Sequence, residues 1–332
     1  MKQVKFITGL MAFGVVSLFA GCGEKENEMT KVTLNEVAHS IFYAPQYVAL
    51  ENGYFTQEGL DLDLVTGYGA DKTMAAVISG EAQIGFMGAE ASVYAYLEGA
   101  NDPVINFAQG TQRAGNFLVA REEMADFQWS DLKGKEVLGG RKGGMPEMVF
   151  EYILKENGLD PAKDLSIDQS IDFGSTAAAF SGGKGKFTVE FEPAATTLEK
   201  NGDGFVVASL GVDSGYVPYT SYSAKTSYVE KHPEIIQAFT DGLQKGVDYV
   251  NSHTAEEIAK VIQPQFKEND LDTITRIVER YQSQDTWKEN LVFEKESFEL
   301  LQDILESAGE LEKRADYEKL VTTIYAKEAM KK

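Results

Sequence analysis

From about residue 31 onward, segments in which apolar residues recur with the period of a β-strand alternate with segments in which they recur with the period of an α-helix. Residues 31–36 alternate between apolar and polar, which is typical of a half-buried β-strand. A helix is predicted after Pro233, because apolar residues there keep helical spacing: Ile236, Phe239, Leu243, Val247 and Val250. Short strands that alternate with helices favour an α/β fold.

The pattern contains two similar α/β units. In the first, strands are expected at 31–36, 60–65, 83–87 and 104–108, and helices at 47–52, 72–79 and 91–98. In the second, strands are expected at 135–138, 165–168, 187–191 and 205–209, and helices at 146–157 and 194–200. The helix at 146–157 has Pro146 in its first turn and Gly158 beyond its end, which is the usual asymmetry. The rest of the chain is predicted to be mostly helical.

Two α/β units in one chain of 332 residues predict two lobes. We expect the chain to cross between them near residues 109–115 and 212–219. One lobe then comprises residues 31–110 and 216–332, and the other comprises residues 111–215.

The first 30 residues have the layout of an export signal. Lys2 and Lys5 precede an apolar run, and Cys22, the only cysteine, follows small residues at 20–21. The run is shorter than the about 20 apolar residues that span a bilayer. The arrangement resembles a bacterial lipobox, where the thiol is acylated, although Phe19 stands where leucine is usual. We expect a lipoprotein signal peptide at 1–21 and a tether at 22–30; an ordinary cleaved signal or a short anchor is the alternative.

Composition narrows the possible partners. The formal net charge of −21 disfavours nucleic acid and anionic lipid head groups as partners. The histidines (His39, His232 and His253) lie far apart and form no spaced metal-ligand pair. No cysteine is available to form a disulfide with Cys22 in the same chain. The spacing of the histidines leads us to expect no metal site. We also expect a monomer with no cofactor.

Two glycine- and lysine-rich segments raise the question of a phosphate loop. Neither 139–144 nor 182–186 has the spacing of a nucleotide P-loop. The segment at 182–186 is interpreted as a plain turn. The segment at 139–144 follows a strand and leads into a helix, so its backbone N–H groups could hold a ligand. A tight turn with an exposed Arg-Lys pair is the alternative.

No pattern in the sequence indicates a catalytic set, since Ser-His-Asp signatures, His-Glu-x-x-His and Cys-x-x-Cys are absent. Glu190 and Glu192 share one face of a predicted strand. Glu192 stands before Pro193, so it could cap the next helix or accept hydrogen bonds from a ligand amine. Aromatic residues and methionines recur near predicted strand ends, where ligands of open α/β sheets bind: Phe42, Tyr43, Phe191, Tyr219, Tyr222, Met87 and Met145.

Several segments together resemble one protein family. Residues 43–55 read YAPQYVALENGYF and are followed by EGLD at 58–61. Supporting segments are AQIGF at 82–86, DLKGK at 131–135 and HPEIIQAF at 232–239. From residue 31 to 327 the chain resembles extracytoplasmic solute-binding proteins of ABC importers, in the branch that binds taurine, alkanesulfonates, nitrate or thiamine pyrimidines. The resemblance implies the type II periplasmic-binding-protein fold, with two α/β lobes, a ligand cleft between them and a helical C-terminal tail.

The resemblance also implies a solute site at the loops that follow the strands. Carried over position by position, it comprises Phe42, Tyr43, Gly69, Asp71, Met87, Gly88, Glu90, Arg141, Gly143, Gly144, Met145, Glu192, Tyr219, Ser221 and Tyr222. Sulfonate binders usually carry a Ser/Thr-rich loop at 141–145, where this chain has Gly-Gly-Met. Aromatic lining with Glu90 and Glu192 as acceptors suits a flat, amine-bearing heteroaromatic solute, first of all a thiamine pyrimidine precursor. Riboflavin-like solutes and sulfonate- or nitrate-type anions remain open.

The expected function is therefore capture of a small solute and its delivery to an ABC permease and ATPase, on the outer face of the cell membrane. A pyrimidine-forming synthase of the same fold is a second hypothesis, but its histidine and cysteine chemistry has little support in this sequence. A sensor lipoprotein is a third.

Overall fold

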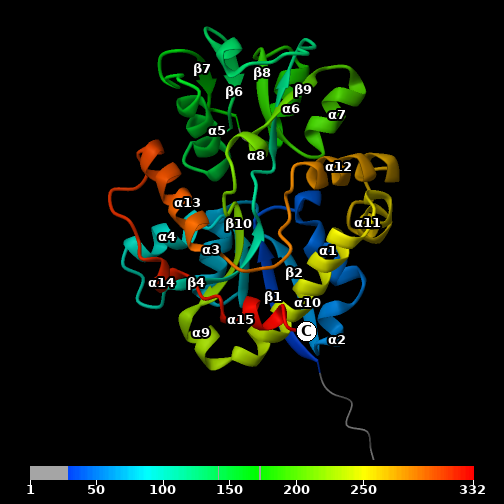
Figure 1. The fold of residues 1–332 in the computed structure, drawn as a ribbon, viewed down its shortest axis with the longest axis vertical. Helices are drawn as coiled ribbons and strands as arrows, with labels where there is room; N and C mark the ends of the chain where they lie inside the picture. The colour runs from blue at the N-terminus through cyan, green and yellow to red at the C-terminus, as the bar shows by residue number, and fades with distance from the viewer. Residues whose placement is uncertain (1–28, 141, 172) are drawn as a thin grey trace, which may run out of the picture.

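The computed structural model describes residues 29–332 except 141 and 172, so Cys22, Arg141 and the predicted signal lie outside the described residues. Its strands form two five-stranded sheets, one in each half of the molecule (Figure 1). We call the sheets with their covering helices lobe 1 and lobe 2. The two-lobed α/β architecture predicted from the sequence is thus confirmed.

Lobe 1 is built on a mixed sheet in the order β2-β1-β3-β10-β4. Its strands are β1 (Thr30–Glu36), β2 (Leu60–Thr66), β3 (Ile84–Met87), β4 (Val104–Thr111) and β10 (Thr220–Lys225). β1 pairs in parallel with β2 and β3, whereas β10 runs antiparallel to both β3 and β4. The first helices of this lobe are η1 (Ile41–Tyr43), α1 (Ala44–Glu51), α2 (Tyr54–Gln57), α3 (Ala70–Ser79) and α4 (Glu90–Leu97).

Lobe 2 repeats the plan with the order β7-β6-β8-β5-β9. Its strands are β5 (Asn116–Ala120), β6 (Glu136–Leu138), β7 (Ser166–Asp168), β8 (Phe187–Phe191) and β9 (Phe205–Ser209). Its helices are η2 (Trp129–Leu132), α5 (Met145–Glu156), α6 (Phe173–Ser181), α7 (Ala194–Asn201) and α8 (Leu210–Asp213). β5 is antiparallel to β8 and β9, so it occupies the place that β10 has in lobe 1.

The predicted helical tail is confirmed and belongs mostly to lobe 1. It comprises α9 (Thr226–Lys231), α10 (Pro233–Ser252), α11 (Ala255–Ile262), η3 (Gln263–Gln265), α12 (Leu271–Ser283), α13 (Lys295–Ala308), α14 (Tyr317–Leu320) and α15 (Ile324–Ala329). The long helix α10 packs on α1, α2 and α15 through the apolar face that the sequence predicted. In the described part of the chain, no helix is both long and apolar enough to cross a membrane.

The strands β5 and β10 were not predicted from the sequence, for two different reasons. β5 is buried along its whole length, so it shows no alternation of apolar and polar residues. β10 contains the polar residues Thr220, Ser221 and Ser223, which are all buried and made the strand resemble a loop. These two strands directly follow the two crossings between the lobes. The crossings lie together, because the Val217 N–H donates to the Gln112 carbonyl at 3.0 Å.

Candidate functional site

The lobes contact each other on both sides of the space between them. On one side, Arg280 of α12 in lobe 1 forms ion pairs with Glu192 at 2.5 Å and Glu199 at 2.6 Å in lobe 2. On the other side, the Tyr94 hydroxyl of α4 donates to the Met148 sulfur of α5 at 3.6 Å. Figure 1 shows these two sides, with α7 above α12 and with α5 above α13 and α4. The residues between them are therefore enclosed by both lobes.

Aromatic rings from both lobes line this interlobe region. Phe42 and Tyr43 form the short helix η1, where the Phe42 carbonyl accepts a hydrogen bond from the Trp287 ring at 2.9 Å. The ring of Tyr219 lies 5.8 Å from that of Phe42 and 6.5 Å from that of Phe191 in lobe 2. Gly115 is needed beside them, since a Cβ there would lie 2.8 Å from the Phe42 ring. The rings make a largely apolar wall that could stack against a planar solute.

Glu90 is the carboxylate that lobe 1 places in this region. It stands in the first turn of α4 and is only 5% exposed, and its Oε2 atom has no hydrogen-bond partner. Burial raises the pKa of Glu90 from 4.5 to about 7. The side chain folds back over Gly88, where a Cβ would come within 2.0 Å of Oε2. Only glycine at position 88 leaves room for the Glu90 carboxylate in this position.

Tyr219 and Asn116 are also among the described residues that have unpaired buried polar atoms, as is Ser214. The Tyr219 hydroxyl is unpaired in a side chain that is 4% exposed, and both polar atoms of the fully buried Asn116 are unpaired. Glu90 lies close enough to Tyr219 to contribute, after burial and Tyr43, to holding the pKa of Tyr219 well above 10. Asn116 opposes Phe191 across β5 and β8, so the two side chains share a face of the lobe 2 sheet. Buried polar groups are nearly always hydrogen-bonded, so each of these unpaired groups is unusual.

Both carboxylate oxygens of Glu192 already have hydrogen-bond partners within the protein. Its Oε2 atom accepts a hydrogen bond from the Thr196 amide at 2.9 Å, which caps α7, and its Oε1 atom contacts Arg280 and Thr196. Both carboxylate oxygens are thus engaged in helix capping and in the contact between lobes.

The loop before α5 carries the remaining lobe 2 residues of the predicted site. The Gly143 N–H donates to Oε2 of Glu147 at 3.1 Å, and Gly144 is the N-cap residue of α5. Met145 begins α5 and is buried in the main core. Burial, followed by the neighbouring Glu151, raises the pKa of Glu147 to about 7.

The remaining predicted residues belong to lobe 1. Met87 packs under α3 with Met74 and Val77, and the Ser221 hydroxyl donates to Asn106 at 2.6 Å. The Tyr222 ring stacks on Phe86 at 4.0 Å. Gly69 is the N-cap residue of α3, and Asp71 is exposed in the first turn of that helix.

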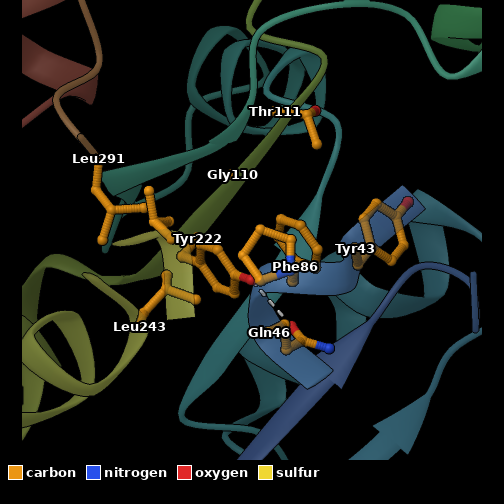
Figure 2. Close-up of a pocket in the computed structure, with 10 residues that line it drawn as sticks. Tyr43, Gln46, Phe86, Gly110, Thr111, Tyr222, Leu243 and Leu291 are labelled. Atoms are coloured by element: carbon orange, nitrogen blue, oxygen red, sulfur yellow. Dashed lines mark hydrogen bonds between the residues drawn. The ribbon is translucent and has the colours of Figure 1, made fainter. Parts of the chain in front are cut away.

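Figure 2 shows the Tyr222 hydroxyl directed at Gln46, beside a small cavity within lobe 1. The cavity measures about 10 Å³ and is lined by residues such as Tyr43, Phe86 and Leu243. That volume admits about one water molecule. It is a packing defect of the lobe 1 core and is too small for an organic solute.

Neither Asn116 nor Arg280 was predicted from the sequence. A polar residue at the start of the apolar run at 117–120, directly after a predicted crossing, is a signal that could have singled out Asn116. Arg280 lies on a plain amphipathic helix, and nothing in its neighbourhood in the sequence distinguishes it. In the described residues, no group of three or more His, Cys, Asp or Glu side chains could hold a metal ion.

Comparisons with known proteins agree with this architecture. Over 302 residues the chain is 46% identical to YtlA of Bacillus subtilis (strain 168), which is named as a binding protein. The match covers 91% of this chain and 90% of YtlA. A ligand-binding component of an ABC-type import system from Staphylococcus aureus superposes with a TM-score of 0.73 at 16% identity, covering 91% and 99% of the two chains.

The alkanesulfonate-binding protein SsuA of Xanthomonas axonopodis pv. citri, bound to MOPS, superposes with a TM-score of 0.71 at 16% identity, covering 89% and 99%. These likenesses establish the type II periplasmic-binding-protein fold. Residues 41–257 match the family described as NMT1/THI5 like. The chain therefore belongs to the NMT1/THI5-like family.

Proposed function

We propose that this protein is the solute-binding component of an ABC importer, working outside the cytoplasm as a monomer. The two lobes close over a small solute, and a permease with its ATPase then receives it. The observation that carries the proposal is the set of buried, unpaired polar atoms on Glu90, Tyr219 and Asn116, enclosed between the lobes beside aromatic rings. A bound solute would supply the missing partners. The function needs no bond to be made or broken.

The solute that suits this site best is a flat, amine-bearing heteroaromatic, such as a thiamine pyrimidine precursor. The rings of Phe42, Tyr43 and Tyr219 offer stacking surfaces, and Glu90 offers an acceptor. Arg280, the guanidinium at the lobe contact, is already paired with Glu192 and Glu199. The aromatic rings and the carboxyl of Glu90 therefore favour a planar base with a donor edge.

The alternative solute is a sulfonate- or nitrate-type anion, and the Xanthomonas protein is named for binding alkanesulfonates. Arg141, which lies outside the described residues, and the backbone amides of Gly143 and Gly144 are the groups that would hold such an anion. The Gly143 amide donates instead to the Glu147 carboxylate, which would have to move before an anion could take its place. This contact favours the heteroaromatic solute.

Tyr43→Ala tests the proposed solute class. Loss of the ring should lower the affinity for a heteroaromatic solute about tenfold or more, because stacking is worth about 0.5–1.5 kcal/mol beyond the buried area. The solute is first found by a thermal-shift screen of vitamins, pyrimidines, sulfonates and anions, and its affinity is then measured by calorimetry. A taurine or nitrate hit whose affinity survives Tyr43→Ala would replace the heteroaromatic proposal with the anion proposal.

We also propose that Cys22 carries a lipid that anchors the protein to the outer face of the membrane. Cys22→Ser should release the protein into the medium or leave its signal uncut, because only a thiol is acylated. Fractionation of cells with detergent extraction measures this. Membrane association and processing that are unchanged by the substitution would exclude the lipid anchor.

A further inference from the structure

Arg280 of lobe 1 lies among lobe 2 groups that contact its guanidinium from several sides. Its Nη1 atom lies 2.5 Å from Oε1 of Glu192, and its Nη2 atom lies 2.6 Å from Oε2 of Glu199. The Thr196 hydroxyl is 3.3 Å from Nη1, and the centroid of the Phe117 ring is 5.2 Å from the guanidinium carbon. We call Phe117, Glu192, Thr196 and Glu199 the arginine socket. Carboxylates with an aromatic face form a setting that a planar guanidinium fits and a lysine ammonium does not.

The arginine socket is held in place by lobe 2 itself. The Glu192 carboxylate accepts a hydrogen bond from the Thr196 amide at the start of α7, and the Glu192 side chain is 0% exposed. Oε1 of Glu199 accepts a hydrogen bond from the Val206 amide of β9 at 3.2 Å. Phe117 belongs to β5, which is buried along its whole length. The socket residues are therefore positioned by contacts that do not involve Arg280.

Arg280 is held in place by lobe 1 in the same way. Its helix α12 buries Ile274 and Ile277 and packs on α11 (Figure 1). The next residue, Tyr281, is fully buried, and its ring lies 5.2 Å from the ring of Phe42 in η1. Since both partners are fixed to their own lobes, the lobes separate only when the guanidinium leaves the socket.

The exposed ion pairs beside the arginine socket are weaker than the Arg280 contact. Arg276 lies 3.1 Å from Glu199 with a side chain that is 48% exposed, and Lys200 lies 3.4 Å from Asp270 with a side chain that is 35% exposed. Water and salt screen such pairs, so they contribute little. Arg280 is less exposed and bridges two carboxylates. Both lobes carry a net negative charge, so a guanidinium between them also offsets their repulsion.

We propose that Arg280 and the arginine socket form a latch that keeps the solute-free protein predominantly closed. The inference goes beyond the proposed function, because it concerns the state of the protein before any solute arrives. A solute then enters through a minor open form, in which the guanidinium has left the socket. The latch therefore slows the entry of a solute, since entry has to wait for this opening.

Small-angle X-ray scattering of the purified protein, with any bound solute removed by dialysis, tests the latch. Arg280→Met should lower the ratio of closed to open protein about tenfold or more, because it removes hydrogen bonds between charged groups, and the radius of gyration should increase. Arg280→Lys should increase the radius less, because an ammonium keeps the charge without the planar fork. Arg276→Met is the matched control on the same helix and should leave the radius unchanged.

A change on the lobe 2 side supplies an independent measurement. Glu199→Gln should also increase the radius of gyration, and combining it with Arg280→Met should add little, since the two changes break one shared contact. Fully additive increases would overturn the latch, because they would show that the two residues act separately.

The remaining outcomes are also decisive. Wild-type radii for both Arg280→Met and Arg280→Lys would overturn the latch and leave the proposed function standing, because no solute takes part in the measurement. Arg280→Lys decides the matter alone if Arg280→Met fails to fold. An increase for Arg276→Met as large as that for Arg280→Met would show that the exposed ion pairs hold the lobes together, and it would overturn the role given to the socket.

Discussion

Arg280→Met is expected to lower the free energy of unfolding by about 3 kcal/mol, because it leaves a buried carboxylate without its counterion. The Glu192 side chain is 0% exposed and the Arg280 side chain is 18% exposed, with 2.5 Å between their charged atoms. Methionine keeps most of the apolar stem of arginine, so the change isolates the lost charge. Calorimetry should show a melting temperature lower by about 6 °C or more.

Arg276→Met is the control on the same helix. Arg276 is 48% exposed and pairs with Glu199 alone, at 3.1 Å, so its loss should cost less than about 1 kcal/mol. Equal effects of the two substitutions would show that burial does not strengthen the Arg280 pair. Because Glu192 and Glu199 belong to lobe 2, Arg280→Met should also weaken the contact between the lobes.

The sequence predicted those elements of the fold whose signals are local. The helix expected at 146–157 is present at Met145–Glu156, since Pro146 in its first turn and Gly158 with its positive φ act within a few residues. β5 and β10 were missed because their burial comes from contacts with distant strands. Burial on both faces removes the alternation on which a strand prediction depends.

The candidate site could be predicted only as a set of regions near strand ends. The structure brings Phe42 and Tyr219 together with Phe191 of lobe 2, and the binding roles of these residues and of Glu90 stay predictions. The roles of individual polar residues were not predictable. Glu192 pairs with Arg280, 88 residues away in the sequence, and the side chain of Asn116 is notable only because it has no hydrogen-bond partner among the described residues. Hydrogen-bond partners that are distant in the sequence decide which carboxylate is free to bind a solute.

The protein should become less stable by several kcal/mol as the pH rises from about 5 to about 7. Burial is the largest cause that raises the pKa values of Glu90, Glu147 and Glu190 from 4.5 to about 7. At a pH between 4.5 and about 7, these three carboxyl groups are ionised in the unfolded chain, whereas in the folded protein they keep their protons. The folded state thus binds more protons, so the free energy of unfolding falls with rising pH, by up to about 1.4 kcal/mol per pH unit and group.

Neither His39 nor the described carboxylates with lowered pKa values oppose this loss of stability between pH 5 and pH 7. A hydrogen bond to Glu36 is the main cause that raises the pKa of His39, so the stability it contributes is also lost as the pH rises above 6.5. Carboxylates with lowered pKa values, such as Asp168 at about 2 beside Lys184, lose their contribution only at lower pH. The decline between pH 5 and 7 therefore reports the buried acids.

Glu190→Gln is the variant that tests this origin, since Glu190 is 1% exposed and accepts a hydrogen bond from the Thr188 hydroxyl, which glutamine can also accept. The substitution should raise the melting temperature at pH 8 and should flatten its decline between pH 5 and pH 7. The exposed Glu122→Gln should change neither. A melting temperature that stays constant over this pH range would show that the buried carboxyls lose their protons in the folded protein as readily as in the unfolded chain.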